Sequence, residues 1–369
     1  MLSICRDLDA QSNYTVPRTF ALQAYLTKSF RNLATRSPDH PFTMSQPTAN
    51  LGQAAFDAAR AKDIRRKAGR FRILIIGRAN AGKTTILKKV CNTTEEPHIY
   101  NSRGMEIDLD IVRPTDERGL HDIDNEMIFL SNPGFIFHDS RGFEAGNTTE
   151  LKHVKDFISR RANQRKLKNQ VHAIWYCIPM DNNRPVTKAE DTFFEECGTG
   201  HVPVIVVFTK LDALDDQAFG ALKQENPDIT HAEALIQAPL RAQQDFEARR
   251  PNLRIFKSRY PPKDHVYLRD MNLPTTDCIQ LLERTAAAID NDVLQMLFVS
   301  TQQSSLKLCT QYAIGKILAR TQGLDPAHKL TLKEIQSSIL RWYPHILDVS
   351  IYGVSHFLCS DFNHHLTRM

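Results

Sequence analysis

The chain has 369 residues, enough to bury a sizeable core in one large domain with extensions or in two domains. Its 47 Lys and Arg side chains and 42 Asp and Glu side chains leave a mild net charge of +5, which predicts no specific nucleic-acid partner. The seven cysteines are scattered without zinc-ligand spacing, and no apolar run reaches the roughly 18 residues that span a bilayer, so we expect a cytoplasmic protein with no transmembrane segment.

Residues 1–66 are predicted to form an irregular N-terminal extension with some helix, because they lack strand alternation and are rich in Ser, Thr, Asn and Pro over residues 38–50. Residues 20–33 have apolar side chains near helical spacing, with basic side chains between them. A mitochondrial presequence is one interpretation, but Asp7 and Asp9 precede the segment and such presequences are poor in acids. A loosely docked helix is the favoured interpretation.

A predicted buried strand over residues 71–76 runs directly into a glycine-containing loop. The strand is apolar and rich in β-branched side chains, as in a parallel sheet. The loop reads G-x-x-x-x-G-K-T, in which the glycines let backbone N–H groups curl round an anion. The dipole of the helix that follows points at the same anion. A chance glycine turn with a stray lysine is the alternative, but the order of strand, turn and helix favours a phosphate-binding P-loop.

This P-loop predicts most of the phosphate contacts. The residues expected to cradle the nucleotide here are Gly77, Arg78, Ala79, Asn80, Ala81, Gly82, Lys83, Thr84 and Thr85. Among them, Lys83 is expected to reach the β- and γ-phosphates and to act in catalysis, and the Thr84 hydroxyl is expected to bind Mg²⁺.

Two short strands over residues 126–130 and 135–138 are predicted to form an antiparallel hairpin, because Ser-Asn-Pro-Gly between them is a strong turn signal. The second strand ends in D-x-x-G, whose fixed letters are Asp139 and Gly142. A carboxylate at the end of a strand beside the P-loop can bind Mg²⁺, and the glycine N–H can contact a γ-phosphate. We therefore expect both residues in the catalytic centre, with Asp139 as a metal ligand.

A fully buried strand over residues 201–208 ends in the motif T-K-L-D, which supplies Thr209, Lys210 and Asp212 as nucleotide-binding residues. The Asp212 carboxylate can accept hydrogen bonds from N1–H and the exocyclic amine of guanine, a donor pair that adenine lacks. The stem of Lys210 is expected to pack over the base. A polar turn after a strand is the alternative, and the preceding P-loop and D-x-x-G make it the weaker one.

Residues 213–262 are charged and helix-prone, and they form an enlarged connection to a last predicted strand. A helix over residues 278–289 completes a nucleotide-binding domain of residues 67–290, and residues 291–369 are predicted to be a helical C-terminal region.

The loop that closes over the base is expected near Arg269 and Asp270, after the last strand. Lys257 and Ser258 are the competing position.

With GRANAGKT, DSRG and TKLD in this order, the chain resembles the TRAFAC class of P-loop GTPases. It is similar to fungal proteins known only as G-domain-containing proteins and, more distantly, to Era-like, septin-like and chloroplast import receptor GTPases. The resemblance implies an α/β P-loop NTPase fold of three layers with a mostly parallel six-stranded sheet. It also implies Mg²⁺ and switch loops that differ between GTP and GDP states.

Two departures from the family bear on hydrolysis. Phe143 follows the D-x-x-G glycine, where Ras-like members carry the glutamine that orients the attacking water. The switch threonine that in the family binds Mg²⁺ is expected at Thr115, and three other side chains are also available for that role: Thr93, Thr94 and Ser102.

Two devices could compensate for the missing glutamine. Asn80 lies at the asparagine of the G-x-P-N-x-G-K-[ST] loop of Era-like GTPases, several of which use K⁺ as an activator, although Ala79 replaces the usual proline. Alternatively, Asn80 is a turn residue that tolerates an unusual backbone conformation. The second device is an arginine acting in trans across a homodimer, for which Arg141 and Arg78 are candidates.

The sequence therefore predicts a GTP-binding protein that slowly hydrolyses GTP to GDP and phosphate with Mg²⁺ and acts as a nucleotide-dependent switch. Its expected partners are GTP and GDP, together with a second copy or an effector protein that binds the switch loops and the C-terminal helices. A hydrolysis-poor GTP-binding scaffold is the alternative that Phe143 motivates. A P-loop ATPase or kinase is disfavoured, because T-K-L-D has no role in it.

Overall fold

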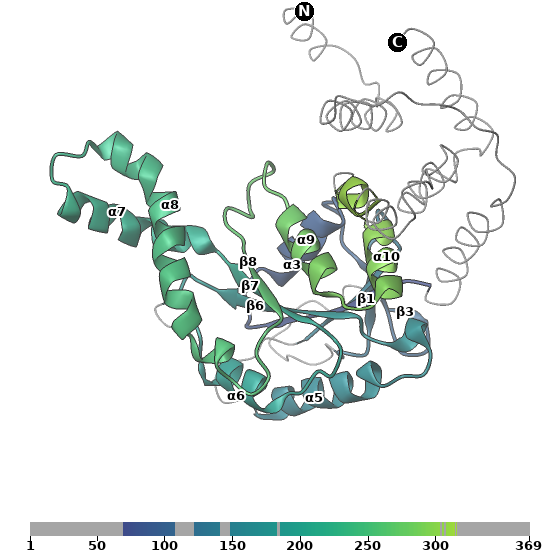
Figure 1. The fold of residues 1–369 in the computed structure, drawn as a ribbon. Helices are drawn as coiled ribbons and strands as arrows, with labels where there is room; N and C mark the ends of the chain where they lie inside the picture. Colours follow the sequence, from purple (N-terminus) through teal and green to yellow (C-terminus); the bar gives the residue numbers. More distant parts are fainter. Residues whose placement is uncertain are drawn as a thin grey trace, which may run out of the picture. The chain divides into compact units, whose positions relative to one another are not determined.

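The computed structural model describes residues 69–107, 122–140, 148–182, 185–302, 305, 308–313 and 315. The chain divides into two compact units, and the unit that ends at Leu308 contains all the strands of the described residues. This unit is built on a mostly parallel β-sheet with helices against both faces, which is the α/β class predicted from the sequence (Figure 1).

The sheet has eight strands in the described part of the chain, so the expectation of six was wrong. They are β1 (Phe71–Gly77), β2 (His98–Tyr100), β3 (Glu106–Ile107), β4 (Glu126–Ile128), β5 (Phe135–Asp139), β6 (Ala173–Pro179), β7 (Val204–Thr209) and β8 (Asp264–Tyr267). Their spatial order is β3-β2-β4-β5-β1-β6-β7-β8. The five strands from β5 to β8 in this order are parallel to one another.

The two additional strands come from the polar stretch after the P-loop helix. β2 pairs antiparallel with both β3 and β4, and β4 pairs antiparallel with β5 as the predicted hairpin requires. The turn between β2 and β3 is closed by the Asn101 side chain, which accepts hydrogen bonds from the N–H groups of Arg103 and Met105. Strands of three and two residues leave too few alternating side chains to be recognised as a pattern.

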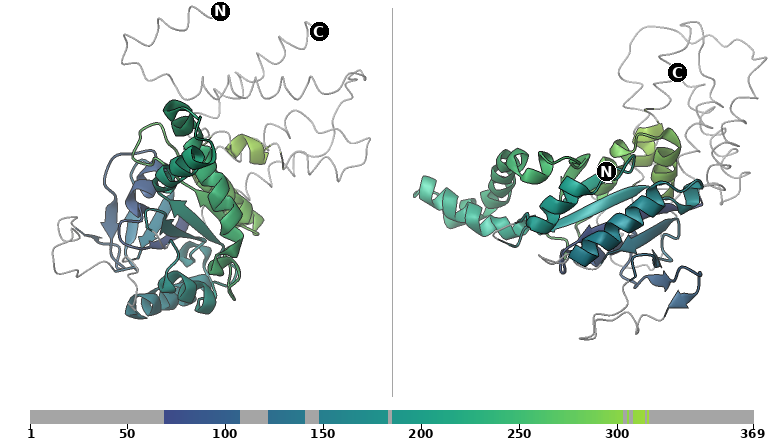
Figure 2. Two further views of the ribbon diagram at one scale, coloured as in Figure 1. Left: turned by 90° about the vertical axis from the view of Figure 1, so that its left-hand side faces the viewer. Right: turned by 90° about the horizontal axis from the view of Figure 1, so that it is seen from below.

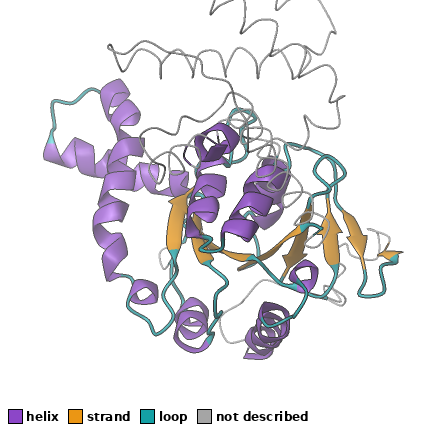
Figure 3. Ribbon diagram, turned by 45° about the vertical axis from the view of Figure 1, so that its right-hand side comes forward, coloured by secondary structure: helices purple, strands orange, loops and turns teal. Residues whose placement is uncertain are grey.

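The helices cover the sheet on both faces (Figure 3). They are α3 (Lys83–Val90), α5 (Thr148–Ala162), α6 (Lys188–Glu196), α7 (Asp215–Glu225), α8 (His231–Arg249), α9 (Ile279–Ala288) and α10 (Asp292–Thr301), with short 3-10 turns at Leu167–Asn169, Leu211–Leu214, Arg250–Asn252 and Arg254–Phe256. Helices α3, α9 and α10 lie on one face, and α5 and α6 lie on the other (Figure 1).

Alternate side chains of β1 supply the two halves of the core. Leu74 and Ile76 belong to the apolar cluster under α5 and α6. On the opposite face the Phe71 ring packs against Phe298 of α10 with 4.8 Å between ring centroids. All the residues of β1 are buried, which is why this strand reads as a continuous apolar run rather than as an alternation.

The enlarged connection predicted between β7 and β8 is a helical hairpin made of α7 and α8. Helix α7 and the N-terminal part of α8 project from the sheet (Figure 2), whereas the C-terminal part of α8 packs on it through Phe246, whose ring centroid lies 4.9 Å from that of Phe208 in β7. The two helices pack against each other through the small side chains of Ala218, Ala238 and Ala242. The root of the hairpin therefore lies next to the T-K-L-D motif that ends β7, whereas its tip is remote from the sheet.

The expected domain boundary at residue 290 falls between α9 and α10, within the compact unit that ends at Leu308. Helix α10 packs on the start of β1 through Phe298, and residues 308–313 are helical, as expected for this part of the chain. None of the helices in the described ranges combines the length and the apolar character needed to cross a membrane.

Candidate functional site

The site is built on loops that leave the carboxyl ends of neighbouring parallel strands. The P-loop follows β1, and its first glycine cannot be replaced by a larger residue. Gly77 has φ 146°, and a Cβ atom there would lie 2.3 Å from the carbonyl oxygen of Cys177 on the adjacent strand β6. Gly82, with φ 79°, is the N-cap of α3. The two glycines of the motif thus let the chain turn sharply from the strand into the helix.

Lys83, the first residue of α3, points back into the loop. Its Nζ donates to the carbonyl oxygens of Gly77 and Arg78, at 3.3 Å in each case. The same Nζ lies 3.8 Å from Oδ1 of Asp139 at the end of β5. The structure therefore brings together the lysine of the P-loop and the aspartate of D-x-x-G, which the sequence places on separate elements.

The Asp139 carboxylate lies in an environment that disfavours its charge. Burial raises the pKa of Asp139 to about 6, and the neighbouring Lys83 ammonium only partly opposes that rise. Its Oδ1 atom and the Ser140 hydroxyl are buried and have no hydrogen-bond partner among the described residues. The Asp139 Oδ1 atom, which faces the Lys83 ammonium at 3.8 Å, and the exposed Thr84 hydroxyl are oxygen atoms of the kind that Mg²⁺ prefers as ligands.

The T-K-L-D motif contacts the P-loop directly. The buried Thr209 hydroxyl donates to the carbonyl oxygen of Ala81 at 2.9 Å. The next residue, Lys210, has a left-handed backbone with φ 55°, and its Nζ lies 2.5 Å from Oδ2 of Asp181 in the loop after β6. The T-K-L-D motif and the P-loop thus meet at this edge of the sheet.

Asp212 lies against the loop after β8. Its Oδ1 accepts a hydrogen bond from the N–H of Asp270 at 2.9 Å, and Asp270 has a left-handed backbone with φ 51°. Of the two positions considered for the base-closing loop, the structure places Arg269 and Asp270 beside the T-K-L-D motif. The chain that follows Lys257 and Ser258 instead lies at the amino end of β7, where the N–H of Lys263 donates to the carbonyl oxygen of Val204.

This loop is also tied to the P-loop helix. The Lys89 Nζ of α3 donates to the carbonyl oxygens of Leu273 and Thr276, at 2.5 and 2.9 Å. Arg269 forms an ion pair with Asp215 at the start of α7, with 2.5 Å between Nη2 and Oδ1. The loop after β8 therefore has one anchor on α3 and another on the root of the helical hairpin.

Arg78, the second residue of the P-loop, does not project from the rim as the trans-arginine hypothesis requires. Its Nε lies 3.2 Å from Oε1 of Glu190, whose side chain is fully buried near the start of α6. Its Nη2 donates to the carbonyl oxygen of Pro185. Glu190 was not predicted from the sequence, because a single glutamate in a helix carries no signal of the arginine that it contacts.

Asn80 is exposed at the tip of the loop, and its backbone is left-handed with φ 58°. Asparagine adopts this conformation more readily than most residues, so the turn interpretation of Asn80 has support from the backbone. Ala79 and Thr85 are likewise exposed next to the loop.

Several predicted residues lie outside the described residues: Thr115, Arg141, Gly142 and Phe143. Of the other candidates for the switch threonine, Thr93 accepts a hydrogen bond from the N–H of Glu95 beyond the last turn of α3. Ser102 lies in the turn between β2 and β3, on the far side of β4 and β5 from β1. Both positions are remote from the P-loop.

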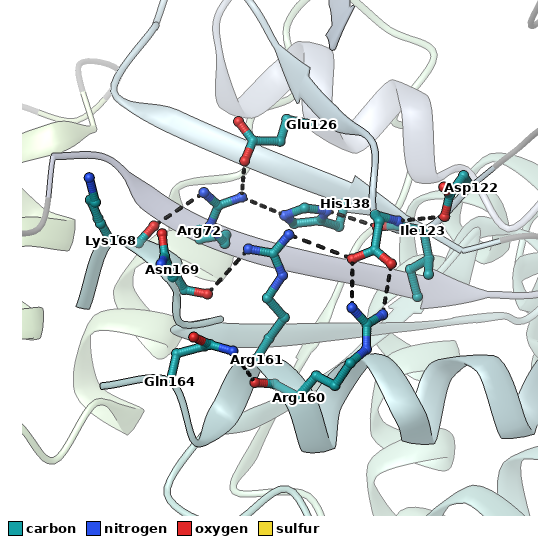
Figure 4. A network of polar contacts seen from close by, with 11 residues as sticks. Arg72, Asp122, Ile123, Glu126, His138, Arg160, Arg161, Gln164, Lys168 and Asn169 are labelled. Atoms are coloured by element: carbon teal, nitrogen blue, oxygen red, sulfur yellow. Dashed lines mark hydrogen bonds and ion pairs between the residues drawn. The ribbon is translucent and has the colours of Figure 1, made fainter. Parts of the chain in front are cut away.

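A network of polar contacts surrounds Arg72, a buried residue of β1 (Figure 4). The Arg72 guanidinium donates from Nη1 to Glu126 Oε1 at 2.7 Å and lies 2.8 Å from Nε2 of His138. Burial, with the Arg72 charge as a second cause, lowers the pKa of His138 to about 3. His172, whose Nδ1 accepts from the Arg72 N–H, has its pKa lowered to about 4, mainly by burial. These two histidines are therefore neutral core residues rather than surface residues.

The arrangement offers a turn of backbone N–H groups at a helix N-terminus, a lysine, and a carboxylate whose Oδ1 atom is buried. It also offers a second carboxylate, that of Asp212, beside the loop after β8. Together they could hold a phosphate chain at one end and a base at the other. The family models contain none that matches this chain, and no curated protein matches it either.

Proposed function

We propose that the chain is a GTP-binding protein of the P-loop NTPase fold that slowly hydrolyses GTP and acts as a nucleotide-dependent switch. The observation that carries the proposal is the hydrogen bond between Thr209 and Ala81, because it joins the T-K-L-D motif to the P-loop. Motifs for base and phosphate that are in contact at the carboxyl edge of a parallel sheet have a combined use. This support agrees with the resemblance to TRAFAC-class GTPases.

The phosphate end of the proposed site is formed by the loop from Gly77 to Lys83 and by the N-terminus of α3. Backbone N–H groups of this loop would bind the β-phosphate, and the Lys83 ammonium would shift from the Gly77 and Arg78 carbonyl oxygens towards the β- and γ-phosphates. Thr84 and Asp139 would hold Mg²⁺, which supplies positive charge to the phosphate oxygens.

The base end is formed by Lys210, Asp212 and the loop at Asp270. One oxygen of Asp212 is held by the Asp270 N–H, which orients the carboxylate and leaves the other oxygen to accept from guanine. Since adenine lacks the N1–H and exocyclic amine donor pair, this carboxylate favours GTP and GDP over ATP and ADP.

Slow turnover follows from the side chains around the γ-phosphate position. The P-loop arginine is held by Glu190 and does not serve as a finger, and the residue after the D-x-x-G glycine is not a glutamine. K⁺ bound near Asn80 or a partner protein would supply the missing charge. The second candidate function, a GTP-binding scaffold with little hydrolysis, is favoured by the same two observations.

The proposal is tested by nucleotide binding to the full chain in Mg²⁺, with labelled GDP displaced by GTP or ATP. We expect GTP to compete and ATP to compete poorly.

Lys83→Ala should abolish tight binding, because a charged contact to phosphate is lost. Asp212→Asn should shift the preference from guanine to xanthine nucleotides, with Asp216→Asn on the exposed side of α7 as the matched control. Efficient displacement by ATP, or unchanged GTP affinity in Asp212→Asn, would contradict the proposal. A single-turnover hydrolysis assay distinguishes the two candidate functions, because a switch converts its bound GTP to GDP and a scaffold leaves the GTP largely intact.

A further inference from the structure

The P-loop contains one charged side chain that points away from the nucleotide position. Arg78 turns its guanidinium towards α6, where Nε lies 3.2 Å from Glu190 Oε1 and Nη2 donates to the Pro185 carbonyl oxygen. The Arg78 side chain is 13% exposed and the Glu190 side chain is 0% exposed, so the pair is largely removed from water.

Glu190 is held in place independently of Arg78. Its Oε2 accepts hydrogen bonds from the Thr187 N–H at 2.6 Å and from the Thr187 hydroxyl, and together they form the capping box of α6. The carboxylate is therefore fixed to the N-terminus of a helix that packs on the sheet. It is a rigid anchor for whatever binds its other oxygen.

The backbone carbonyl group of Arg78 accepts two hydrogen bonds from within the P-loop and the start of α3. One comes from the Lys83 Nζ at 3.3 Å and the other from the Ala81 N–H at 3.3 Å. A continuous series of contacts thus runs from the Glu190 carboxylate, through the guanidinium and carbonyl group of Arg78, to the lysine that is expected to bind phosphate.

A buried ion pair is weak evidence of stabilisation, because the free energy lost on taking both charges out of water is comparable to the free energy of their attraction. What such a pair does supply is a defined geometry. We infer that Glu190 is a positioning residue of the phosphate site, which holds Arg78 and thereby presets the P-loop around the β-phosphate. This inference rests on the proposed function, and it adds a residue from α6 that no motif contains.

The test compares the affinities of GDP and GMP for the full chain, with GMP measured by competition at millimolar concentration. The β-phosphate of GDP lies in the P-loop, whereas GMP lacks it. Glu190→Gln should therefore lower the affinity for GDP by about 10- to 100-fold, as is found for outer groups that orient metal ligands. The affinity for GMP should stay close to the wild-type value, so the ratio of the two affinities falls.

Two further variants keep the test decisive. Glu190→Gln leaves an uncompensated Arg78 and is expected to lower the stability, so the double variant Arg78→Met with Glu190→Gln removes both charges while preserving much of the volume. It should fold and still show the reduced ratio. Glu126→Gln, which removes the partner of Arg72 at the other end of β1, is the matched control and should keep the wild-type ratio.

A double variant that folds and retains the wild-type ratio of GDP to GMP affinity would overturn the positioning role. The same holds if Glu126→Gln lowers the ratio as much as Glu190→Gln does, because the effect would then be one of general stability. Absence of guanine nucleotide binding in the wild-type chain would overturn the proposed function itself.

Discussion

The hydroxyl of Thr209, the last residue of β7, donates a hydrogen bond of 2.9 Å to the carbonyl oxygen of Ala81 in the P-loop, 128 positions earlier in the chain. Both residues are buried. Through this bond the end of one parallel strand fixes the loop that follows another strand, two positions away in the sheet. The loop after β7 is thereby tied directly to the P-loop, in addition to the contacts that Lys89 makes with the loop after β8.

Thr209→Val should weaken both folding and nucleotide binding. The replacement keeps the shape of the side chain but leaves the Ala81 carbonyl oxygen buried without its donor, which costs about 1–3 kcal/mol. We expect the free energy of unfolding in urea to fall by that amount and the affinity for GDP to fall with it. Thr209→Ser retains the hydroxyl and is the control. Wild-type GDP affinity in a destabilised Thr209→Val protein would show that the bond serves the fold alone.

Asp139→Asn should stabilise the nucleotide-free protein at pH 7. The pKa of Asp139 is raised to about 6 by burial, against an ordinary value of 3.8. The folded state therefore binds more protons than the unfolded state between pH 4 and pH 6, and stability falls as the pH rises through that window. A shift of about two pH units corresponds to roughly 3 kcal/mol, which the neutral amide avoids in part.

The measurement is urea unfolding with EDTA at pH 4 and pH 7. Asp139→Asn should be more stable than the wild type at pH 7 and similar to it at pH 4, while Mg²⁺-dependent GTP binding is weakened. Asp216→Asn, at an exposed position, controls for the change of net charge. A variant that is less stable than the wild type at pH 7 would mean that Asp139 stabilises the fold through Lys83, and that its burial is not the dominant effect.

The parts of the site that were predictable are those in which one short stretch of sequence carries the whole signal. The P-loop has glycine where the backbone touches a neighbouring strand, at Gly77, and where it is left-handed at the start of α3, at Gly82, so the motif reports much of its own geometry. The buried parallel strands β1 and β7 were predictable because a strand covered on both faces is apolar at every position.

The remaining features depend on pairs of residues that only the folded chain brings together. The ion pair of Arg78 with Glu190 and the buried contact of Arg72 with His138 join residues on different strands and helices, and neither partner has a distinctive neighbourhood in the sequence. Strand β3 has two residues, and its existence depends on pairing with β2. Such features follow from topology, which periodicity along one segment does not encode.

The buried histidines should make the protein acid-labile. The folded-state pKa values of His138 and His172 are lowered to about 3 and about 4, against an ordinary value of 6.5. The unfolded state therefore binds more protons below pH 6.5, so stability is fully present above that pH and is lost as the pH falls. Each histidine adds about 1.4 kcal/mol per pH unit to the slope within its window.

His138→Gln should reduce that slope by about one proton between pH 6 and pH 4, because its amide oxygen can still accept from Arg72 without gaining a proton. The measurement is the free energy of unfolding in urea at half-unit steps of pH. His153→Gln, on an exposed part of α5, controls for the substitution itself. An unchanged slope in His138→Gln would indicate that the acid lability comes from other groups.

The last prediction separates two roles of Asn80, whose backbone is left-handed with φ 58°. If its carboxamide helps to bind K⁺, the cation places positive charge where the bridge between the β- and γ-phosphates becomes negative, and GTP turnover should be faster in K⁺ than in Na⁺ at equal ionic strength. Asn80→Gly removes the carboxamide but favours the left-handed backbone, whereas Asn80→Ala removes the carboxamide and strains the turn. On the potassium hypothesis both variants lose the K⁺-specific gain. On the turn hypothesis Asn80→Gly behaves like the wild type, only Asn80→Ala binds nucleotide more weakly, and the rates in the two salts are equal throughout.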